Sequence, residues 1–561
     1  MSTINFFAIH EADPNYDDVA SIYRELKYKL ADASSVKTQL DVIRTWDQLR
    51  RQLYTWWTLT HLRFNQDTRN EEYKKARDHC DEVQPKLTEL ENNFKRQLLN
   101  SLVKPELESH LGRTAFLRWE ADIKSYDPVI EKDTVAESKL KADYIELVAR
   151  KEVEFRGEKY TLSAIQKFSQ EPDRELRYEA RKATWNWAAE NGEALDGIYD
   201  EQVKLRAAMA RKLGFDNFIG LGYQRMCRLD YGRQDVARFR EQVRDYVVPF
   251  AAELRGKQAA RLGVEKLYDW DEALNDPRGN PKPRGDHDWL LDRAQEMFDG
   301  MGGGLGSFFR MMRTSNLMDL KIREGKSGGG FCTDFPKHGL PFIFANFNGT
   351  KGDVEVFTHE MGHAFQSYLS RDKPLIDYLW PTTDACEIHS MSLEFLTWGY
   401  MEKFFSDDAE RFRRSHLETA ILFLPYGVAV DHFQHLVYEK PEASAADRKV
   451  MWQEMERVYL PWRDYGDMIY PAEGGRWQLQ RHIYLHPFYY IDYTLAQTCA
   501  IQFWVRARRD DAEAMEAYVA LCRRGGEALF QELVASADLV SPFHDDCLRE
   551  VVDTVRRELE L

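Results

Sequence analysis

The chain has 561 residues, 43% of them hydrophobic and 30% charged, and a formal net charge of −16. These values describe an ordinary globular protein long enough for one large domain or two lobes. The acidity argues against a nucleic-acid-binding protein, which needs a basic surface. We expect no membrane span, since no apolar run approaches the length that one requires.

The seven cysteines are scattered along the chain and form no C-x-x-C pair. An odd, scattered set fits a reducing cytosol better than a disulfide framework. The first residues, MSTINFFAIHEADPNYDD, lack the basic region and the long apolar stretch of a signal peptide. We therefore expect a cytoplasmic protein.

The first third of the chain, from about residue 17 to residue 190, has the apolar periodicity of long amphipathic helices. Thr68 and Glu71 form a capping-box pattern, and Pro85 should kink or restart the helix that follows. A short β-hairpin is expected over residues 152–162, turning at Gly157. We predict an N-terminal helical lobe over residues 1–190 and a second lobe, with C-terminal helices, over residues 191–561.

After a second helical region and a proline-rich loop, one clear β region appears. Residues 319–323, 328–333 and 342–347 read as three short strands around glycine turns, which predicts a small antiparallel sheet. The second of these strands begins with Gly328, Gly329 and Gly330, which put no side chains in the way. A peptide could pair with this edge through main-chain hydrogen bonds. The alternative is that the glycines only permit a tight turn.

The sequence VEVFTHEMGHAFQ, residues 354–366, contains an H-E-x-x-H motif. On a helix, His359 and His363 lie about one turn apart on the same face and can reach one ion. Glu360 can then act on water without binding the metal. Zinc prefers such donors, and a catalytic site leaves one coordination position free. The alternative is a chance match on an amphipathic helix.

A third ligand must come from elsewhere in the chain. The extended motif fails because Gln366 and Leu369 occupy its glycine and final histidine positions. The segment DACEIHSMSLEFLTW, residues 384–398, offers Glu387 and Glu394, which lie two helical turns apart on one face. One could bind the metal while the other orients a histidine ligand. Solvated helix carboxylates are the alternative, but the neighbours are largely apolar.

A second group of candidate residues follows the loop EGGR at residues 473–476. It comprises two histidines and three tyrosines: His482, His486, Tyr489, Tyr490 and Tyr493. Pro487 fits the first turn of a helix, which would place Tyr490 and Tyr493 on one face. A tyrosine hydroxyl can donate to a developing oxyanion. Taken alone, tyrosines at this spacing are more often core residues than catalytic ones.

The motif HEMGHAFQ followed by CEIHSMSLEF resembles the thimet oligopeptidase family of zinc metallopeptidases, peptidase family M3, and in particular its oligoendopeptidase F branch. Two further stretches agree: LKIREGKSGGGFCTDFPKHGLPFIFANFNGT before the metal motif and RHIYLHPFYYIDYTLAQ after it. The resemblance is strong over roughly residues 320–497.

This resemblance implies a mainly α, multi-helical, two-lobed zincin-like fold with a deep substrate channel. It implies one Zn²⁺ per chain bound by His359, His363 and Glu387, with Glu394 supporting a ligand and Glu360 as general base. It also implies that a tyrosine, Tyr490 or Tyr493, and a histidine, His482 or His486, contact the substrate and the tetrahedral intermediate. Further substrate contacts are expected from the glycine run and one more tyrosine, namely Gly328, Gly329, Gly330 and Tyr489.

The expected activity is hydrolysis of internal bonds in short unstructured peptides, with no nucleic-acid or membrane partner. Two alternatives stay open. One is a metallocarboxypeptidase or dipeptidyl carboxypeptidase, which can use the same ligands. The other is a non-catalytic peptide-binding protein with a structural metal, although such a site needs no general base at Glu360.

Overall fold

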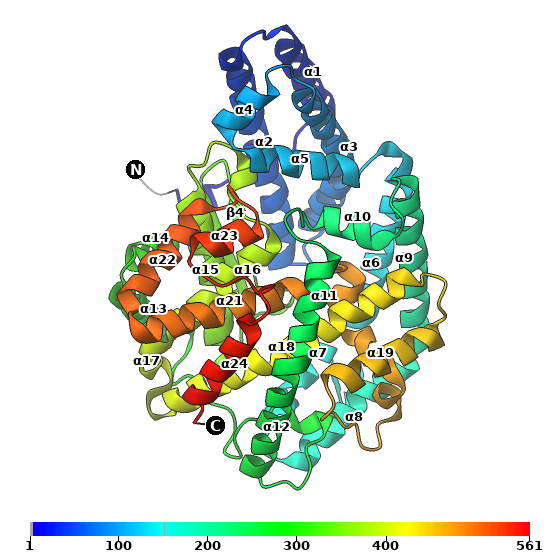
Figure 1. Cartoon of the computed structure of the whole chain (residues 1–561), viewed down its shortest axis with the longest axis vertical. Coiled ribbons are helices and arrows are strands. Elements are labelled where there is room, and N and C mark those ends of the chain that lie inside the picture. The colour runs from blue at the N-terminus through cyan, green and yellow to red at the C-terminus, as the bar shows by residue number, and fades with distance from the viewer. Residues whose placement is uncertain (1–3, 151, 561) are drawn as a thin grey trace. The chain divides into compact units, whose positions relative to one another are not determined.

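The structure is a computed structural model that describes residues 4–150 and 152–560, and its fold is mainly α (Figure 1). The chain divides into two compact units, each assembled from three segments. Unit 1 comprises Met1–Lys124, Lys282–Asp407 and Cys499–Leu539, and unit 2 comprises Ser125–Pro281, Asp408–Thr498 and Val540–Leu561. The predicted lobes, residues 1–190 and 191–561, do not coincide with these units and remain a prediction. Among the described helices, none has the length and apolar character that crossing a membrane requires.

Unit 1 begins with the long amphipathic helices that the sequence predicts. They are α1 (Tyr16–Asp32), α2 (Val36–Gln66), α3 (Glu71–Leu99), α4 (Lys104–Leu111) and α5 (Arg113–Ser125). Trp46, Phe94 and Trp119 are fully buried where these helices pack, and Trp46 lies 4.8 Å from Phe94 and 5.5 Å from Trp119 between ring centroids. These apolar residues of the long helices therefore belong to a buried core.

Of two predictions about α3, the capping box at Thr68 is wrong, and the restart that was one of two options at Pro85 does not occur. Its N-cap is Asn70, whose side chain accepts hydrogen bonds from the next turn, whereas the Thr68 hydroxyl donates to the carbonyl of Gly325 at 2.8 Å. The helix also continues through Pro85 as a single element. Proline removes one helical hydrogen bond, but Val83 and Leu87 are buried on either side and hold the segment in place.

The second segment of unit 1 carries the sheet. Helices α13 (His287–Met301) and α14 (Leu305–Thr314) precede strands β3 (Met318–Lys321), β4 (Phe331–Phe335) and β5 (Leu340–Phe347). The strand order is β3-β5-β4. The expected antiparallel pairing occurs between β4 and β5, with Cys332 opposite Ile343. Strand β3 pairs with β5 in parallel instead, because the chain crosses from β3 to the far edge before returning in the middle.

Two helices follow the sheet and carry the metal motif. Helix α15 (Lys351–Ser370) packs against β5 and against α16 (Thr383–Leu396). A Cβ on Gly362 would lie 2.6 Å from the carbonyl oxygen of His389, so the two helices cross at a glycine. The unit is completed by α17 (Glu402–Phe405), α22 (Asp511–Arg524) and α23 (Phe530–Ser536).

Unit 2 is helical apart from one hairpin, β1 (Val153–Phe155) and β2 (Glu158–Tyr160), which turns at Arg156 and Gly157 as predicted. Its first helices are α6 (Glu131–Arg150), α7 (Leu162–Ile165), α8 (Arg174–Glu190), α9 (Gly192–Lys212), α10 (Phe218–Arg225), α11 (Arg233–Gln242) and α12 (Val248–Leu262). Its later helices are α18 (Ala409–Glu439), α19 (Ala445–Tyr459), α20 (Arg481–Leu485) and α24 (Cys547–Glu558). Helix α21 (Tyr490–Arg509) begins in unit 2.

Two further predictions, both in unit 2, need correction. The stretch at residues 473–476 is part of helical turns over Pro471–Gly475 and Arg476–Leu479, with Gly474 at φ 88°. Pro487 precedes α21 and does not form its first turn. The reason lies at Phe488, which adopts φ 68° and donates its N–H to the side-chain oxygen of Gln434 at 2.9 Å, outside the helix.

Candidate active site

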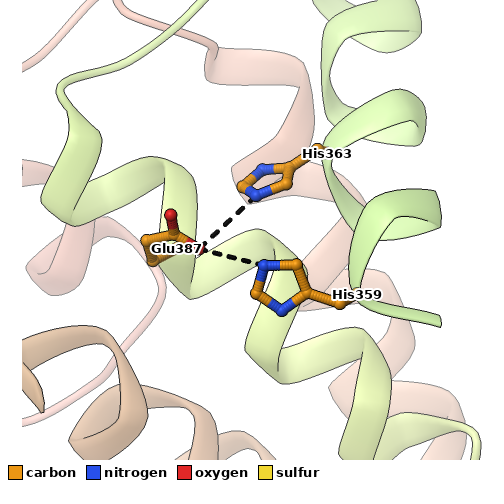
Figure 2. A group of neighbouring side chains, drawn as sticks. All are labelled: His359, His363 and Glu387. Atoms are coloured by element: carbon orange, nitrogen blue, oxygen red, sulfur yellow. Dashed lines mark ion pairs between the residues drawn. The ribbon is translucent and has the colours of Figure 1, made fainter. Parts of the chain in front are cut away.

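Three side chains from the two crossing helices of unit 1 converge as the sequence predicts (Figure 2). Glu387 Oε2 lies 3.3 Å from Nε2 of His359 and 3.4 Å from Nε2 of His363. Ligand atoms at the corners of a zinc tetrahedron are about 3.3 Å apart, given bonds of about 2.0–2.1 Å. Two imidazole nitrogens and one carboxylate oxygen, all within 4.8 Å of one another, could hold a single transition-metal ion.

Glu394 supports the first histidine. Its Oε1 lies 2.7 Å from Nδ1 of His359, so it fixes the ring with Nε2 toward Glu387. Burial by itself lowers the pKa of His359, but hydrogen bonds to Glu387 and Glu394 outweigh it and hold this pKa well above its usual value. Two carboxylates around one imidazole therefore make a site that favours positive charge.

Ser390 supports the carboxylate in the same way. Its hydroxyl donates to Glu387 Oε2 at 2.9 Å, and both residues are buried. Burial raises the pKa of Glu387, but the two histidines more than offset this and hold it well below its usual value. Sequence reasoning gave Ser390 no role, although its i+3 position after Glu387 carried the signal.

Glu360 is 7% exposed and lies beside these three residues without joining them. Its Oε2 is buried and accepts no hydrogen bond within the described part of the chain. Burial raises the pKa of Glu360, partly offset by the charges of the two histidines. A buried carboxylate with a spare acceptor is what a general base for water needs.

The glycine run reaches this carboxylate from the sheet. A Cβ on Gly330 would lie 3.6 Å from Glu360 Oε1 and 3.0 Å from a methyl of Val356. Gly328 and Gly329 are exposed, and the run leads directly into β4, the edge strand of the sheet. A side chain at Gly330 would therefore extend beside Glu360, where glycine leaves space.

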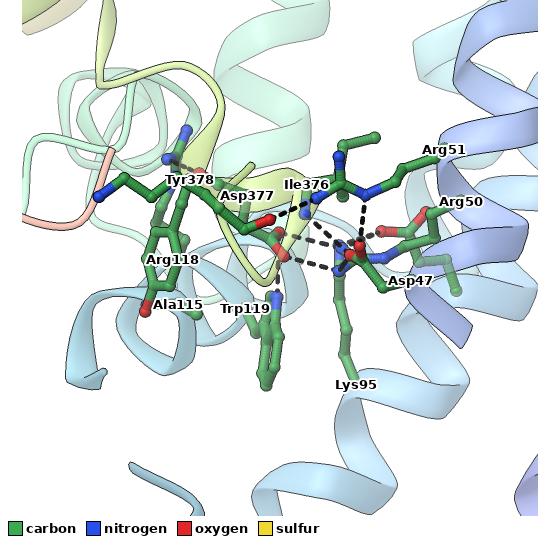
Figure 3. Close-up of polar contacts among 12 residues, drawn as sticks. Asp47, Arg50, Arg51, Lys95, Ala115, Arg118, Trp119, Ile376, Asp377 and Tyr378 are labelled. Carbon is green, nitrogen blue, oxygen red and sulfur yellow. Dashed lines mark hydrogen bonds and ion pairs between the residues drawn. The ribbon is translucent and has the colours of Figure 1, made fainter. Parts of the chain in front are cut away.

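Buried polar contacts secure the connection between α15 and α16 (Figure 3). Arg50 donates to both oxygens of Asp377, at 3.0 and 2.7 Å, and the indole of Trp119 donates to the same carboxylate at 3.1 Å. Arg118 donates to the carbonyl of Trp380 at 2.9 Å. The N-terminal helices of unit 1 thus hold the segment that sets the spacing of the two ligand-bearing helices.

Trp380 links this connection to the site. Its ring centroid lies 6.1 Å from that of His363, and its indole N–H donates to Asp334 Oδ1 at 3.0 Å. Burial raises the pKa of Asp334, which is 3% exposed, to about 6. The sequence offered no signal for either residue, because their relation to His363 exists only in three dimensions.

The second group of candidates forms one aromatic cluster in unit 2. The ring of His482 lies 5.1 Å from Tyr490, 5.8 Å from Tyr493 and 5.8 Å from Tyr489 between centroids. Tyr490 and Tyr493 are 5.7 Å apart. His486 is exposed at the margin, 6.2 Å from Tyr489. The predicted face of α21 is therefore present, with His482 nearer to it than His486.

Gln480 orients His482, which sequence reasoning missed. The Tyr426 hydroxyl donates to Gln480 Oε1 at 2.7 Å, and Gln480 Nε2 lies 2.9 Å from His482 Nδ1. Because the amide nitrogen donates, Nδ1 accepts, and a neutral ring carries its proton on Nε2. In that tautomer, Nε2 of His482 is a hydrogen-bond donor.

Comparisons with known proteins agree with these features. The family model described as Peptidase M3 N-terminal domain matches residues 6–126, and the one described as Peptidase family M3 matches residues 307–553. A solved structure of PZ peptidase A with an inhibitor is 45% identical, with 99% of each chain covered and a TM-score of 0.95.

Two further structures are similar over almost the whole chain. One, provisionally described as an oligoendopeptidase F, is 46% identical, with 100% of this chain and 99% of that chain covered and a TM-score of 0.96. Another of the same provisional description, from Bacillus anthracis, is 42% identical, with 100% and 99% covered and a TM-score of 0.91. A search of curated proteins gives no match.

Proposed function

The chain belongs to peptidase family M3 and is a metalloendopeptidase, and from this premise we propose that its metal is zinc, held by His359, His363 and Glu387. The observation that carries the proposal is the position of Glu387 Oε2, 3.3 and 3.4 Å from the two Nε2 atoms. Three nitrogen and oxygen donors leave a fourth tetrahedral position, as in catalytic zinc sites. One ion per chain is expected.

Glu360 is proposed to carry out the proton transfers of the hydrolysis. A bound metal supplies Lewis-acid chemistry, which polarises a carbonyl and lowers the pKa of water. Glu360 accepts a proton from the water while the oxygen of that water forms a bond to the scissile carbonyl carbon. The same carboxylate then passes the proton to the amine nitrogen as the C–N bond breaks. Its burial and its spare Oε2 acceptor support this role.

The substrate contacts are proposed from the cluster in unit 2 and from the edge of the sheet. The hydroxyl of Tyr490 or Tyr493 would donate to the oxyanion as it develops. His482, with its proton on Nε2, would donate to the peptide, while His486 and Tyr489 would serve at the margin. Gly328, Gly329 and Gly330 would pair with an extended peptide through the main chain.

The proposed substrate is a short unstructured peptide cleaved at internal bonds. A dipeptidyl carboxypeptidase is the alternative, and it would need a free C-terminus. A peptide-binding protein with a structural metal is disfavoured because such a protein has no use for the buried carboxylate of Glu360. The deep channel and the cytoplasmic location remain predictions.

The test uses peptides blocked at both ends, with products read by mass spectrometry. We expect internal cleavage that a chelator abolishes and zinc restores. Glu360→Gln should retain the metal yet lower kcat at least ~10²-fold, since only the base is removed. Cleavage confined to peptides with a free C-terminus would favour the carboxypeptidase, and normal turnover in metal-loaded Glu360→Gln would refute the mechanism.

A further inference from the structure

Unit 2 contains a cavity of about 260 Å³ that the proposed reaction does not use. It lies among α8, α12 and the segment near residue 270. Six of its 13 lining residues are charged, four arginines and two acids: Arg177, Arg181, Arg255, Arg476, Asp269 and Glu272. A lining of this kind points to an ionic ligand rather than an apolar one.

Each carboxylate around the cavity is shared by two arginines. Asp269 pairs with Arg181 and, at 2.7 Å, with Arg476. The same arrangement occurs at two neighbouring acids, where Asp271 pairs with Arg174 and Arg177, and Glu272 pairs with Arg255 and Arg463. Glu456 lies 3.8 Å from Arg463, and Glu418, farther away, is itself shared by Arg261 and Arg414.

These groups leave positive charge uncompensated. Six arginines face three shared carboxylates and Glu456, so the local formal charge is +2 in a chain whose net charge is −16. The excess is therefore a local feature and not a consequence of composition. Excess guanidinium charge around a cavity stabilises a bound anion.

Terminal nitrogens of these arginines already donate within the protein, as Arg177 does to Asp271 and Arg255 to Glu272, but three buried Nε donors lack partners. The Nε atoms of Arg177, Arg255 and Arg476 are buried and make no hydrogen bond within the described residues, and all three side chains line the cavity. Arg177 is 3% exposed and Arg255 is 9% exposed. Leaving a buried charged donor unpaired is costly. An oxyanion is the ligand that would accept from several guanidinium groups at once.

We propose that this cavity binds a small multivalent oxyanion, of the phosphate class, independently of the peptidase site. The local charge calls for a ligand with more than one negative charge. The planar guanidinium fork matches the oxygens of a phosphate group. The ligand is either the free ion or the phosphate group of a small metabolite.

The experiment is calorimetric titration of the metal-loaded enzyme with inorganic phosphate at constant ionic strength. We expect saturable binding to one site per chain, competed by sulfate and not by equal chloride. Arg181→Gln should weaken it at least about tenfold, the scale of one charge-assisted hydrogen bond. Arg476 still pairs with Asp269 in this variant, so folding is least disturbed.

Two more variants separate the cavity from other sites. Ala273→Leu fills an exposed part of the lining and leaves every charged group in place, so it should also weaken binding. Arg278→Gln removes an exposed arginine outside the lining and should leave binding unchanged. Absence of saturable binding overturns the proposal. Binding that Arg181→Gln and Ala273→Leu both leave intact also overturns it, because the phosphate would then bind the metal or be an adventitious ion only.

A parallel titration with glycerol phosphate identifies the source of the ligand. Tighter binding than inorganic phosphate, with the same loss in Arg181→Gln, supports a phosphorylated metabolite. Weaker binding with that loss supports the free ion. Insensitivity of both ligands to Arg181→Gln contradicts the site.

Discussion

At the scale of single residues, the two glutamates of α16 should be separable by metal content. Glu387→Ala removes an oxygen near both Nε2 atoms and should abolish stable metal binding. Glu394→Ala removes only the acceptor 2.7 Å from His359 Nδ1 and should weaken metal binding about 10–100-fold. Glu394→Gln keeps an acceptor and should lose less. Metal content after dialysis measures all three, and full occupancy in Glu387→Ala would reverse the assignment.

Asp334 should make stability depend on pH. Its folded pKa of about 6 lies above the usual value of about 3.9, so the folded state binds the proton more tightly. The stability this group contributes is present below about pH 4 and is lost as pH rises through 6, by up to about 3 kcal/mol. Asp334→Asn, which keeps an acceptor for Trp380, should remove this dependence and gain stability at pH 7.5.

Urea midpoints at pH 4.5, 5.5 and 7.5 test this prediction. Asp372→Asn is the control, because that side chain is 87% exposed and should leave the pH profile unchanged. If Asp334→Asn and the unsubstituted protein show the same slope between pH 4.5 and 7.5, the carboxyl is not held protonated by its surroundings.

The grouping of candidate site residues was predictable where their spacing places them on one face of a helix. His359 and His363 share a helix face by periodicity, and Glu387 and Glu394 share another. Tyr490 and Tyr493 also share a face, but only the family resemblance marks them, and Glu387 among the two glutamates, as candidate site residues. Asp334, Trp380 and Gln480 were not predictable, because each acts through a neighbour that is distant in sequence or lies in a turn without a periodic pattern.

At the scale of elements, the crossing of α15 and α16 depends on Gly362. A Cβ there would lie 2.6 Å from both His389 O and Ser390 Cα, which are backbone atoms that cannot rotate away. Gly362→Ala should force the helices apart, cost about 1–3 kcal/mol and lower metal affinity, since the ligands lie on both helices. Denaturation midpoint and metal titration measure the two effects.

The matched control lies on the same helix. A Cβ on Gly352 would meet only the hydroxyl of Thr350, at 3.3 Å, so Gly352→Ala should be neutral or stabilise by up to about 1 kcal/mol. Equal behaviour of the two variants would show that α15 and α16 can separate without consequence for the ligands.

Elements followed from the sequence wherever apolar periodicity was long. Helices α1 to α3 are examples, whereas the short hairpin followed from its turn at Gly157. The errors arose where tertiary contacts chose among similar local options. Asn70 caps α3 because Thr68 is engaged by Gly325, and Pro85 is tolerated inside the helix because buried neighbours hold it. The parallel β3–β5 pair depends on a crossover that no local pattern encodes.

At the scale of the whole molecule, each unit gathers three segments that stretches of the other unit separate in the sequence. Sequence patterns indicate contacts between residues within a few helical turns of each other. The predicted division at residue 190 therefore did not take these long-range contacts into account. The family resemblance carries information across such distances, since it links the motif near residue 360 with the tyrosines near residue 490.

The tyrosines test whether this link is functional. Tyr490→Phe and Tyr493→Phe each keep the ring and remove the hydroxyl. Because the proposed hydrogen bond forms only as charge develops on the carbonyl oxygen, at least one variant should lower kcat and kcat/KM together by ~10²–10³-fold with KM little changed. Tyr489→Phe, at the helix start beside them, should have a milder effect.

Steady-state kinetics and melting temperature must be read together, since the rings of Tyr490 and Tyr493 pack on Phe423 and His482. Variants that lose stability but keep turnover per folded molecule would make these tyrosines packing residues, and unchanged kinetics and stability in all three would remove both roles.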